Sequence, residues 1–239
     1  MIVSHRHRFI FLKTTKTAGS ALELALAAYC GPDDVLTPLG REEEDLVRAG
    51  ALPIPQNHTL PRARWSFVER LRAPFRGPPA RFTSHMNAAA ARAELGDAVW
   101  AGYFKFAFAR DPWDRVLSLY HWIHRRELAR GARVPSVAEF IGHPRVRRHH
   151  GHGFGVYTID GAVAVDRVCR YERLPEELAF LGELFGLPAP LVLPYTKHLV
   201  RHDRRPPHEV LTAADAARIG EIFADEIALL GYRFPDELP

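Results

Sequence analysis

The chain has 239 residues, of which 32 are basic, 28 are acidic and 13 are histidine, and its formal net charge is +4. A hydrophobic share of 47% is that of a globular protein and excludes wholesale disorder. No apolar run reaches the roughly 18 residues of a membrane-spanning helix, and two cysteines exclude a disulfide scaffold or a zinc site built on three of them. We expect one cytoplasmic domain over residues 1–239, with no membrane contact.

The positive charge is unevenly distributed along the chain. Residues 121–152 contain seven arginines, two acidic residues and six histidines, so the remainder is close to neutral. Local positive charge indicates an anionic partner, which can be a nucleic acid, a lipid or a phosphorylated or sulfated small molecule.

The first predicted elements are a strand, a polar loop and a helix. The apolar run His7–Leu12 predicts a buried strand, and the apolar residues of Ser20–Cys30 predict a helix. Together they form the first half of a βαβ unit.

The region that follows begins with proline, glycine and acidic residues and then becomes mixed. Its predicted elements are an irregular segment over Pro32–Pro61, a helix over Arg62–Arg72, a short strand over Arg81–Ser84 and a helix over Asn87–Leu95.

A second buried strand is predicted over Tyr103–Ala109. Asp111 is a suitable N-cap and Pro112 a suitable first residue for the helix that follows. The remaining predicted elements are a helix over Ser136–Gly142, a basic loop over Arg145–Gly155, a strand within Ala162–Tyr171, a helix over Pro175–Phe185, a loop over Ala189–Pro207 and a helix over Thr212–Leu230. Strands that alternate with helices predict an α/β fold with a mainly parallel central sheet.

The loop after the first strand has the composition of an anion site. A strand that leads through a polar loop into a helix directs free N–H groups and the positive end of the helix dipole at a ligand. Lys16 adds a charge, and Thr17 and Ser20 add hydroxyl groups. The glycines of a Walker A loop are missing, which disfavours a nucleoside triphosphatase. The simpler alternative is a capped helix with an exposed lysine.

The second candidate site follows the second strand. Arg110 lies where this strand ends, and Ser118 lies about two turns into the next helix. Such a pair can hold one phosphate, with the arginine bidentate. The alternative makes Arg110 a surface ion-pair partner and Ser118 a packing residue.

Taken together, these motifs resemble a known family. The run K-T-A-G-S after a strand is similar to the 5′-phosphosulfate loop of sulfotransferases, and F-K-F-A-F-A-R-D-P-W-D-R-V-L-S resembles their 3′-phosphate motif. The carbohydrate-type branch, with heparan sulfate 2-O-, chondroitin and dermatan sulfotransferases, is the most similar. The segments Arg170–Leu174 and Ala224–Phe234 also resemble parts of that branch.

The resemblance implies a P-loop NTPase-like three-layer sandwich that binds 3′-phosphoadenosine-5′-phosphosulfate (PAPS), leaves 3′-phosphoadenosine-5′-phosphate (PAP) as product, and needs no metal. Lys16 would stabilise charge on the leaving group, and Arg110 and Ser118 would bind the 3′-phosphate. The other donor contacts that it implies are Thr17, Ala18, Gly19, Ser20, Lys197 and Arg201.

The general base is expected between the two phosphate motifs. The resemblance implies a histidine there, and His85 is the candidate. A histidine titrates near neutrality, and a positioned base contributes about 10²–10⁴-fold to the rate. His85 as a packed or helix-capping residue and His58 as the base remain alternatives.

The basic segment after residue 144 is expected to contact the acceptor, through His149, His150 and Tyr157. A solvated basic loop and a metal site are alternatives, although no carboxylate or cysteine accompanies the histidines.

Three functions therefore compete. The first is a sulfotransferase that acts on a hydroxyl group of a carbohydrate or small metabolite. The second is a P-loop kinase-like phosphotransferase, and the third is a non-catalytic module that binds a polyanion. Under the first function, the positive charge of residues 121–152 serves one anionic donor rather than a nucleic acid.

Overall fold

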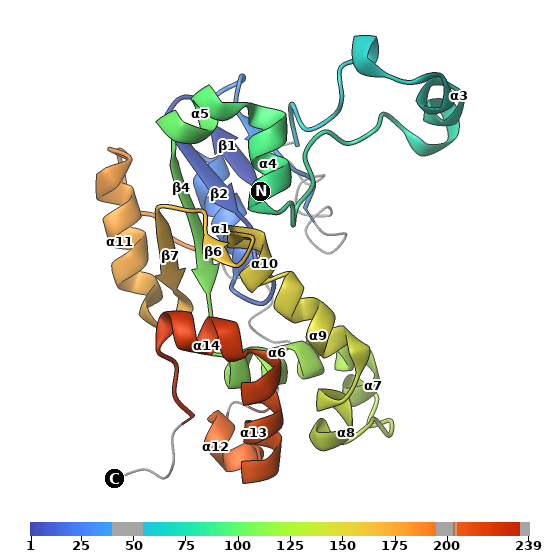
Figure 1. The fold of residues 1–239 in the computed structure, drawn as a ribbon, viewed down its shortest axis with the longest axis vertical. Coiled ribbons are helices and arrows are strands. Elements are labelled where there is room, and N and C mark those ends of the chain that lie inside the picture. Colours follow the sequence, from blue (N-terminus) through green and yellow to red (C-terminus); the bar gives the residue numbers. More distant parts are fainter. Residues whose placement is uncertain (40–54, 195–202, 204, 235–239) are drawn as a thin grey trace.

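The computed structural model describes residues 1–39, 55–194, 203 and 205–234 (Figure 1). Its centre is a five-stranded sheet in the order β3-β1-β2-β4-β7. The parallel neighbours are β2, β4 and β7, whereas β1 is antiparallel to both β2 and β3, so that β1 alone opposes the others. The expected α/β fold with a mostly parallel central sheet is confirmed. The strands are β1 Ile2–Ser4, β2 Phe9–Leu12, β3 Val35–Leu36, β4 Phe104–Ala109 and β7 Arg167–Arg170.

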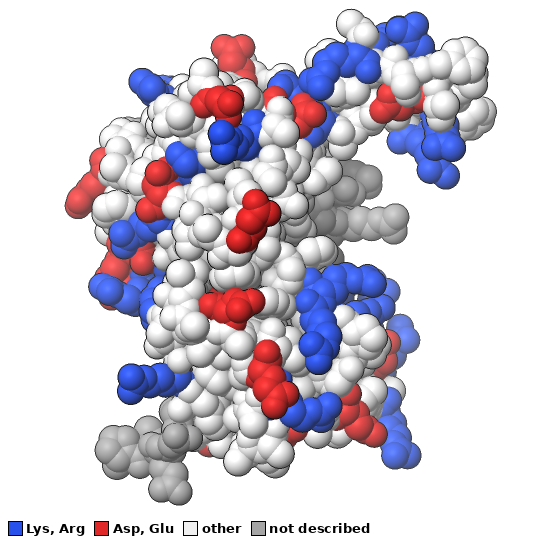
Figure 2. All heavy atoms as spheres, in the orientation of Figure 1, with Lys and Arg blue, Asp and Glu red and all other residues white. Residues whose placement is uncertain are grey.

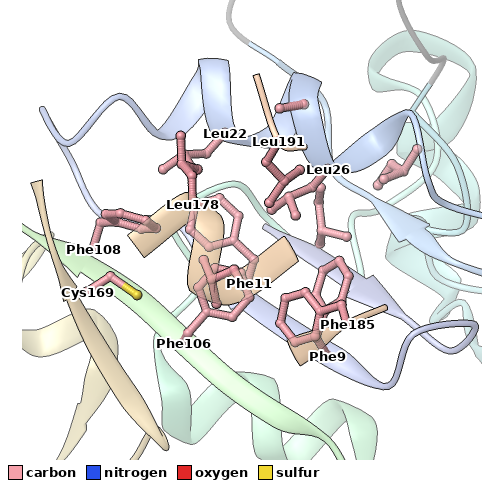
Figure 3. Close-up of a cluster of buried hydrophobic side chains, with 14 residues drawn as sticks. Phe9, Phe11, Leu22, Leu26, Phe106, Phe108, Cys169, Leu178, Phe185 and Leu191 are labelled. Carbon is pink, nitrogen blue, oxygen red and sulfur yellow. The ribbon is translucent and has the colours of Figure 1, made fainter. Parts of the chain in front are cut away.

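One face of the sheet is covered by α1 (Gly19–Ala27) and α11 (Leu174–Leu184). Because successive side chains of a strand point to opposite faces, β2 and β4 present alternate phenylalanines here. Figure 3 shows these rings packed against leucines of the two helices. The phenylalanines are Phe9, Phe11, Phe106 and Phe108.

The opposite face of the sheet packs against short helices. Ile10, Leu12 and Ala107 belong to a second cluster that includes Ala88 and Ala91 of a helix that precedes β4. The helices on this face are α4 Ala88–Leu95, α5 Asp97–Gly102 and α10 Phe154–Tyr157.

A third cluster consists only of helices and loops and lies at one end of the sheet (Figure 1). Its central element is α6 (Pro112–Ile123), which starts directly after β4 and packs against α8 and α13. The other helices of this end are α7 Arg125–Ala129, α8 Val137–Ile141, α9 Pro144–Gly151, α12 Pro207–Val210, α13 Ala213–Ile222 and α14 Ala224–Leu230. The carboxyl ends of β2 and β4 face this cluster.

The remaining elements are short, apart from one helix that projects from the body. This helix is α3 (Phe67–Arg76), which stands away from the sheet in Figure 1. The others are a 3₁₀ turn at Arg62–Arg64, a 3₁₀ turn at Tyr171–Arg173, and the hairpin of β5 Thr158–Ile159 with β6 Ala162–Val163. Within the described ranges, no helix is both long and apolar enough to cross a membrane.

Four local predictions differ from the structure. The helix expected over Arg62–Arg72 is a 3₁₀ turn at Arg62–Arg64 followed by α3, which begins after the Ser66 cap and ends at Arg76. Arg81–Ser84 forms no strand, because the buried Phe82 packs into the second cluster from a turn. The expected loop Arg145–Gly155 is mostly helical, as α9 and the start of α10. The expected C-terminal helix Thr212–Leu230 breaks at Phe223, which separates α13 from α14.

Candidate active site

The two loops that the sequence singled out meet at one edge of the sheet. Because β2 and β4 are parallel, with Leu12 opposite Ala107, the residues that follow them leave the sheet together. Arg110 Nη1 donates to the Lys16 carbonyl oxygen at 2.9 Å and to Ser118 Oγ at 3.3 Å. One guanidinium therefore joins both predicted phosphate motifs.

The loop after β2 has an unusual backbone. Lys16 and Ala18 have φ angles of 64° and 57°, in the left-handed region. Ala18 is the N-cap of α1, and no side chain caps this helix. The first N–H groups of a helix have no partner within it, so these donors are available to an anion.

The side chains of the loop divide between the interior and the open side. The Lys16 ammonium lies 5.4 Å from the centre of the Trp122 ring. Thr17 is fully buried, and its hydroxyl lies 2.8 Å from Thr14 Oγ1, which itself donates to the Phe108 carbonyl. The expected contact of the Thr17 hydroxyl with a ligand is therefore not available, which leaves its backbone N–H.

Lys13 has a structural role beneath the loop. Its ammonium lies 2.5 Å from Glu23 Oε2 and donates to Ser20 Oγ at 3.2 Å, and both charged groups are buried. The sequence signal for this pair was the single acidic residue in the apolar helix α1. A Cβ on Gly19 would lie 2.7 Å from Lys13 Cγ, so the glycine makes room for this side chain.

Arg110 is held on three sides. Asp114 accepts from its Nε at 2.7 Å, and the Tyr171 ring lies 4.3 Å from the guanidinium carbon. Only 11% of the side chain is exposed. Tyr171 was not anticipated as part of this site, because it reaches Arg110 from the turn after β7.

His85 lies beside the first loop, in the turn that precedes α4. Its Nδ1 lies 2.9 Å from the Lys13 carbonyl oxygen. A carbonyl can only accept, so Nδ1 carries the proton and the neutral ring keeps Nε2 as its acceptor. The packed side of the ring is desolvated, which lowers the pKa of His85 below the ordinary 6.5, while its other side faces solvent. This is the arrangement of a neutral base.

Two histidines around α9 approach His85 and the loop. His149 Nδ1 lies 3.1 Å from Thr15 Oγ1, and the His152 carbonyl accepts from the Thr15 N–H at 3.0 Å. The His152 and His85 rings are nearly parallel, with centres 6.0 Å apart. Burial, followed by the charges of His152 and nearby cations, lowers the pKa of His149 to about 4. The contact between Thr15 and His152 was not predicted, because residues 145–155 were expected to form a loop.

The other expected acceptor residues, the half-buried His150 and the buried Tyr157, pack against the body of the protein. The His150 ring packs between Phe154 and Phe223, with centre distances of 5.6 and 5.2 Å. Tyr157 is fully buried and donates to Glu226 Oε1 at 2.9 Å. Neither side chain reaches the site, so both expectations are corrected to packing roles.

Two further predictions cannot be placed. Lys197 and Arg201 lie outside the described residues. Within the described part of the chain, no three histidine, cysteine or acidic side chains are grouped to hold a metal ion.

Comparison with known proteins gives two matches. A family model described as "Sulfotransferase family" matches residues 1–152, which include both loops, His85 and α9. The solved "Crystal Structure of Sulfotransferase from Alicyclobacillus acidocaldarius" is similar with a TM-score of 0.35 and 17% sequence identity, over 94% of this chain and 98% of that one. Among curated proteins, none matches the chain.

Proposed function

The chain belongs to the sulfotransferase family, and from this we propose that it transfers a sulfuryl group from PAPS to a hydroxyl group of a carbohydrate or small metabolite. The main support is the Arg110 guanidinium, which contacts both the Lys16 carbonyl and Ser118. A donor with phosphate groups on its 5′ and 3′ sides needs two anion sites that adjoin each other. A carbohydrate-type enzyme with a P-loop-like donor loop is the finer form of this proposal.

The loop after β2 suits the 5′ side of such a donor. Left-handed backbone at Lys16 and Ala18 is of the kind in which successive N–H groups form a concave anion site, which supports this assignment. The uncapped start of α1 adds further donors and the positive end of its dipole. PAPS supplies the sulfuryl group and would leave as PAP, and the Lys16 ammonium would neutralise charge on the departing phosphate.

Arg110 and Ser118 suit the 3′-phosphate. Arg110 lies just before α6 and Ser118 lies about two turns into it, and their 3.3 Å contact supports the proposal that both side chains bind one phosphate. Asp114 orients the guanidinium but also offsets its charge, so a bound phosphate would compete with this carboxylate for the same donors. The Tyr171 ring supports the guanidinium from the other side.

His85 suits the acceptor side. With Nδ1 fixed on the Lys13 carbonyl, Nε2 can take the proton of an attacking hydroxyl. A lowered pKa keeps the ring neutral at physiological pH. His149 is retained as an acceptor contact, because its ring lies on Thr15 next to Lys16.

The test is sulfuryl transfer from sulfur-labelled PAPS to a panel of hydroxyl acceptors, with ATP and Mg²⁺ as the competing donor. We expect labelled product that persists with chelator, and a loss of about 10²-fold or more in kcat for Lys16→Ala. Transfer of phosphate from ATP without any transfer from PAPS would support the kinase-like alternative instead.

A further inference from the structure

A basic projection, which we call the arm (residues 61–79), extends from the body of the molecule. Its base is closed by backbone hydrogen bonds between residues 58–60 and 79–82, including Leu60 N to the Pro79 carbonyl at 2.8 Å. Arg81 fixes this base to α4 through Glu94 at 3.0 Å. The arm is thus held firmly at its root, and α3 forms its tip.

The tip exposes a continuous apolar stripe. At 3.6 residues per turn, four apolar residues of α3 fall within about 100° of its circumference. Their exposed fractions are 75% for Phe67, 50% for Val68, 59% for Leu71 and 90% for Phe75. No residue of α3 is buried, and a ten-residue helix without packing is marginal in water. A partner that covers this apolar stripe would therefore stabilise α3.

Positive charge surrounds the apolar stripe. Residues 62–76 carry five arginines and one acidic residue, Glu69. The Glu69 carboxylate accepts from the Ser66 N–H in a capping box, so it is used within the arm. Helical spacing places Arg70 and Arg72 on the two borders of the stripe. Figure 2 shows the arm with blue atoms around a white surface.

We propose that the arm docks on the surface of an anionic lipid bilayer, with α3 parallel to the membrane plane. An aromatic and aliphatic face bordered by arginines is the pattern of an interfacial helix. Phenylalanine and leucine enter the boundary of the acyl chains, while the arginines reach anionic headgroups from the borders. A bilayer presents both complementary parts, an anionic layer above an apolar one, along the whole helix. Such docking needs no membrane-spanning helix, so it revises the expectation of no membrane contact.

The arm is joined directly to the candidate active site. The segment that returns from the arm runs through Ser84 to His85. Docking of the arm would therefore hold the candidate active site close to the membrane surface. An acceptor hydroxyl carried by a lipid would be accessible there. The membrane contact itself does not rest on the proposed reaction.

The test is sedimentation of the full chain with vesicles of phosphatidylcholine alone and of phosphatidylcholine mixed with phosphatidylglycerol. We expect binding to the mixed vesicles at low salt and weak binding to the neutral ones. Phe67→Ser with Phe75→Ser should lower the partition coefficient by about tenfold or more. Arg70→Gln with Arg72→Gln should lower the partition coefficient by about tenfold or more and reduce its salt dependence.

The matched control removes exposed apolar side chains from the body. Leu184 on α11 and Val192 are exposed, so Leu184→Ser with Val192→Ser should bind vesicles as the parent does. All variants should keep the thermal unfolding midpoint, since none of these side chains is buried. Three results would overturn the proposal: no binding to anionic vesicles, binding that the Phe67/Phe75 variant retains, or a dimer in sedimentation equilibrium that this variant abolishes.

Discussion

Two residues with left-handed backbone, Lys16 and Ala18, shape the loop that holds the candidate donor site. A non-glycine residue in this region costs roughly 1–2 kcal/mol. Here the loop is fixed by contacts at both ends, with Thr14 bonded to the Phe108 carbonyl and Lys16 to Arg110. The surrounding structure therefore maintains a backbone conformation that costs free energy, and the loop leads directly into the start of α1, which no side chain caps.

Gly19 offers a test of this arrangement. In Gly19→Ala, the new Cβ would meet Lys13 Cγ at 2.7 Å and displace the lysine from Glu23. We expect a loss of about 1–3 kcal/mol in the free energy of unfolding, with weaker binding of PAP, measured by urea denaturation and calorimetry. Gly151→Ala is the control, because its Cβ would meet nothing within 4 Å.

His85 offers a test of the base. We expect His85→Ala to lower kcat by about 10²–10⁴-fold while PAP affinity stays within a few-fold. His58→Ala should leave kcat unchanged, because His58 lies at the root of the arm. Its carbonyl oxygen accepts hydrogen bonds from the backbone N–H groups of Arg81 and Phe82 there. A full rate in the His85 variant would move the base to another residue.

The pH profile gives a second reading of His85. Because the pKa is lowered, the base stays neutral to below pH 6.5, and kcat/KM should fall only in more acidic solution. The same sign applies to stability: the unfolded chain binds the proton more readily, so the free energy of unfolding decreases as pH falls below 6.5. A rate that already halves near pH 7.5 would contradict this assignment.

At the scale of elements, α6 is the device that places Arg110 and Ser118. Asp111 caps it by accepting from the Asp114 N–H at 2.9 Å. Burial, with the nearby Asp114 and Glu172 carboxylates, raises the pKa of Asp111 to about 6. A raised pKa means that the folded state prefers the protonated form, so this contribution to stability is present below pH 3.8 and is lost as pH rises through 6.

The two cap variants therefore have different expected effects. Asp111→Ala removes the acceptor and should cost about 1 kcal/mol. Asp111→Asn keeps an acceptor without the charge, so at pH 7.5 it should be at least as stable as the parent, and this advantage should vanish near pH 4. Thermal unfolding across this pH range measures both, and a strongly destabilised Asp111→Asn at pH 7.5 would show that the charge itself is needed.

The elements that could be predicted are those with a strong local signal. The apolar runs of β2 and β4, the cap of α6 and the capped alanine helix α4 each follow from neighbouring residues. The pairing of Arg110 with Ser118 followed from their spacing, whereas the contact of Arg110 with the Lys16 carbonyl was not predicted. The pairing of Lys13 with Glu23 was not predicted, because it depends on how α1 packs on the sheet.

The elements that were missed depend on contacts distant in sequence. β1 and β3 are three and two residues long and exist only as neighbours in the sheet. α9 has a polar sequence in which only Val146 is buried, so no apolar periodicity indicated a helix. The break at Phe223 allows Glu226 of α14 to reach Arg115. The residues next to Phe223 in the sequence do not indicate this break.

At the scale of the whole molecule, a buried ion pair connects the C-terminal helices to the helix of the site. Arg115 of α6 reaches both oxygens of Glu226, at 3.2 and 2.5 Å, and both side chains are buried. A Cβ on Gly153 would lie 2.4 Å from Arg115 Nη1, so the chain between α9 and α10 also fits around this pair. Three segments thus close around one charge pair.

Removing one partner should be far worse than removing both. Glu226→Gln leaves an uncompensated buried guanidinium and should cost about 3–5 kcal/mol, as should Arg115→Met. The double variant Arg115→Met with Glu226→Leu should lose less free energy of unfolding than either single variant, as measured by urea denaturation. Additive losses would mean that the two charges do not stabilise each other.

The central claim is that Arg110 and Ser118 select a nucleotide with a 3′-phosphate, and calorimetric titration tests it most directly. PAP and AMP differ only in that phosphate. We predict that the protein binds PAP at least about 100-fold more tightly than AMP, a difference of about 2.7 kcal/mol, and that Arg110→Ala reduces this preference to a few-fold. Equal affinities for PAP and AMP in the parent protein would contradict the account.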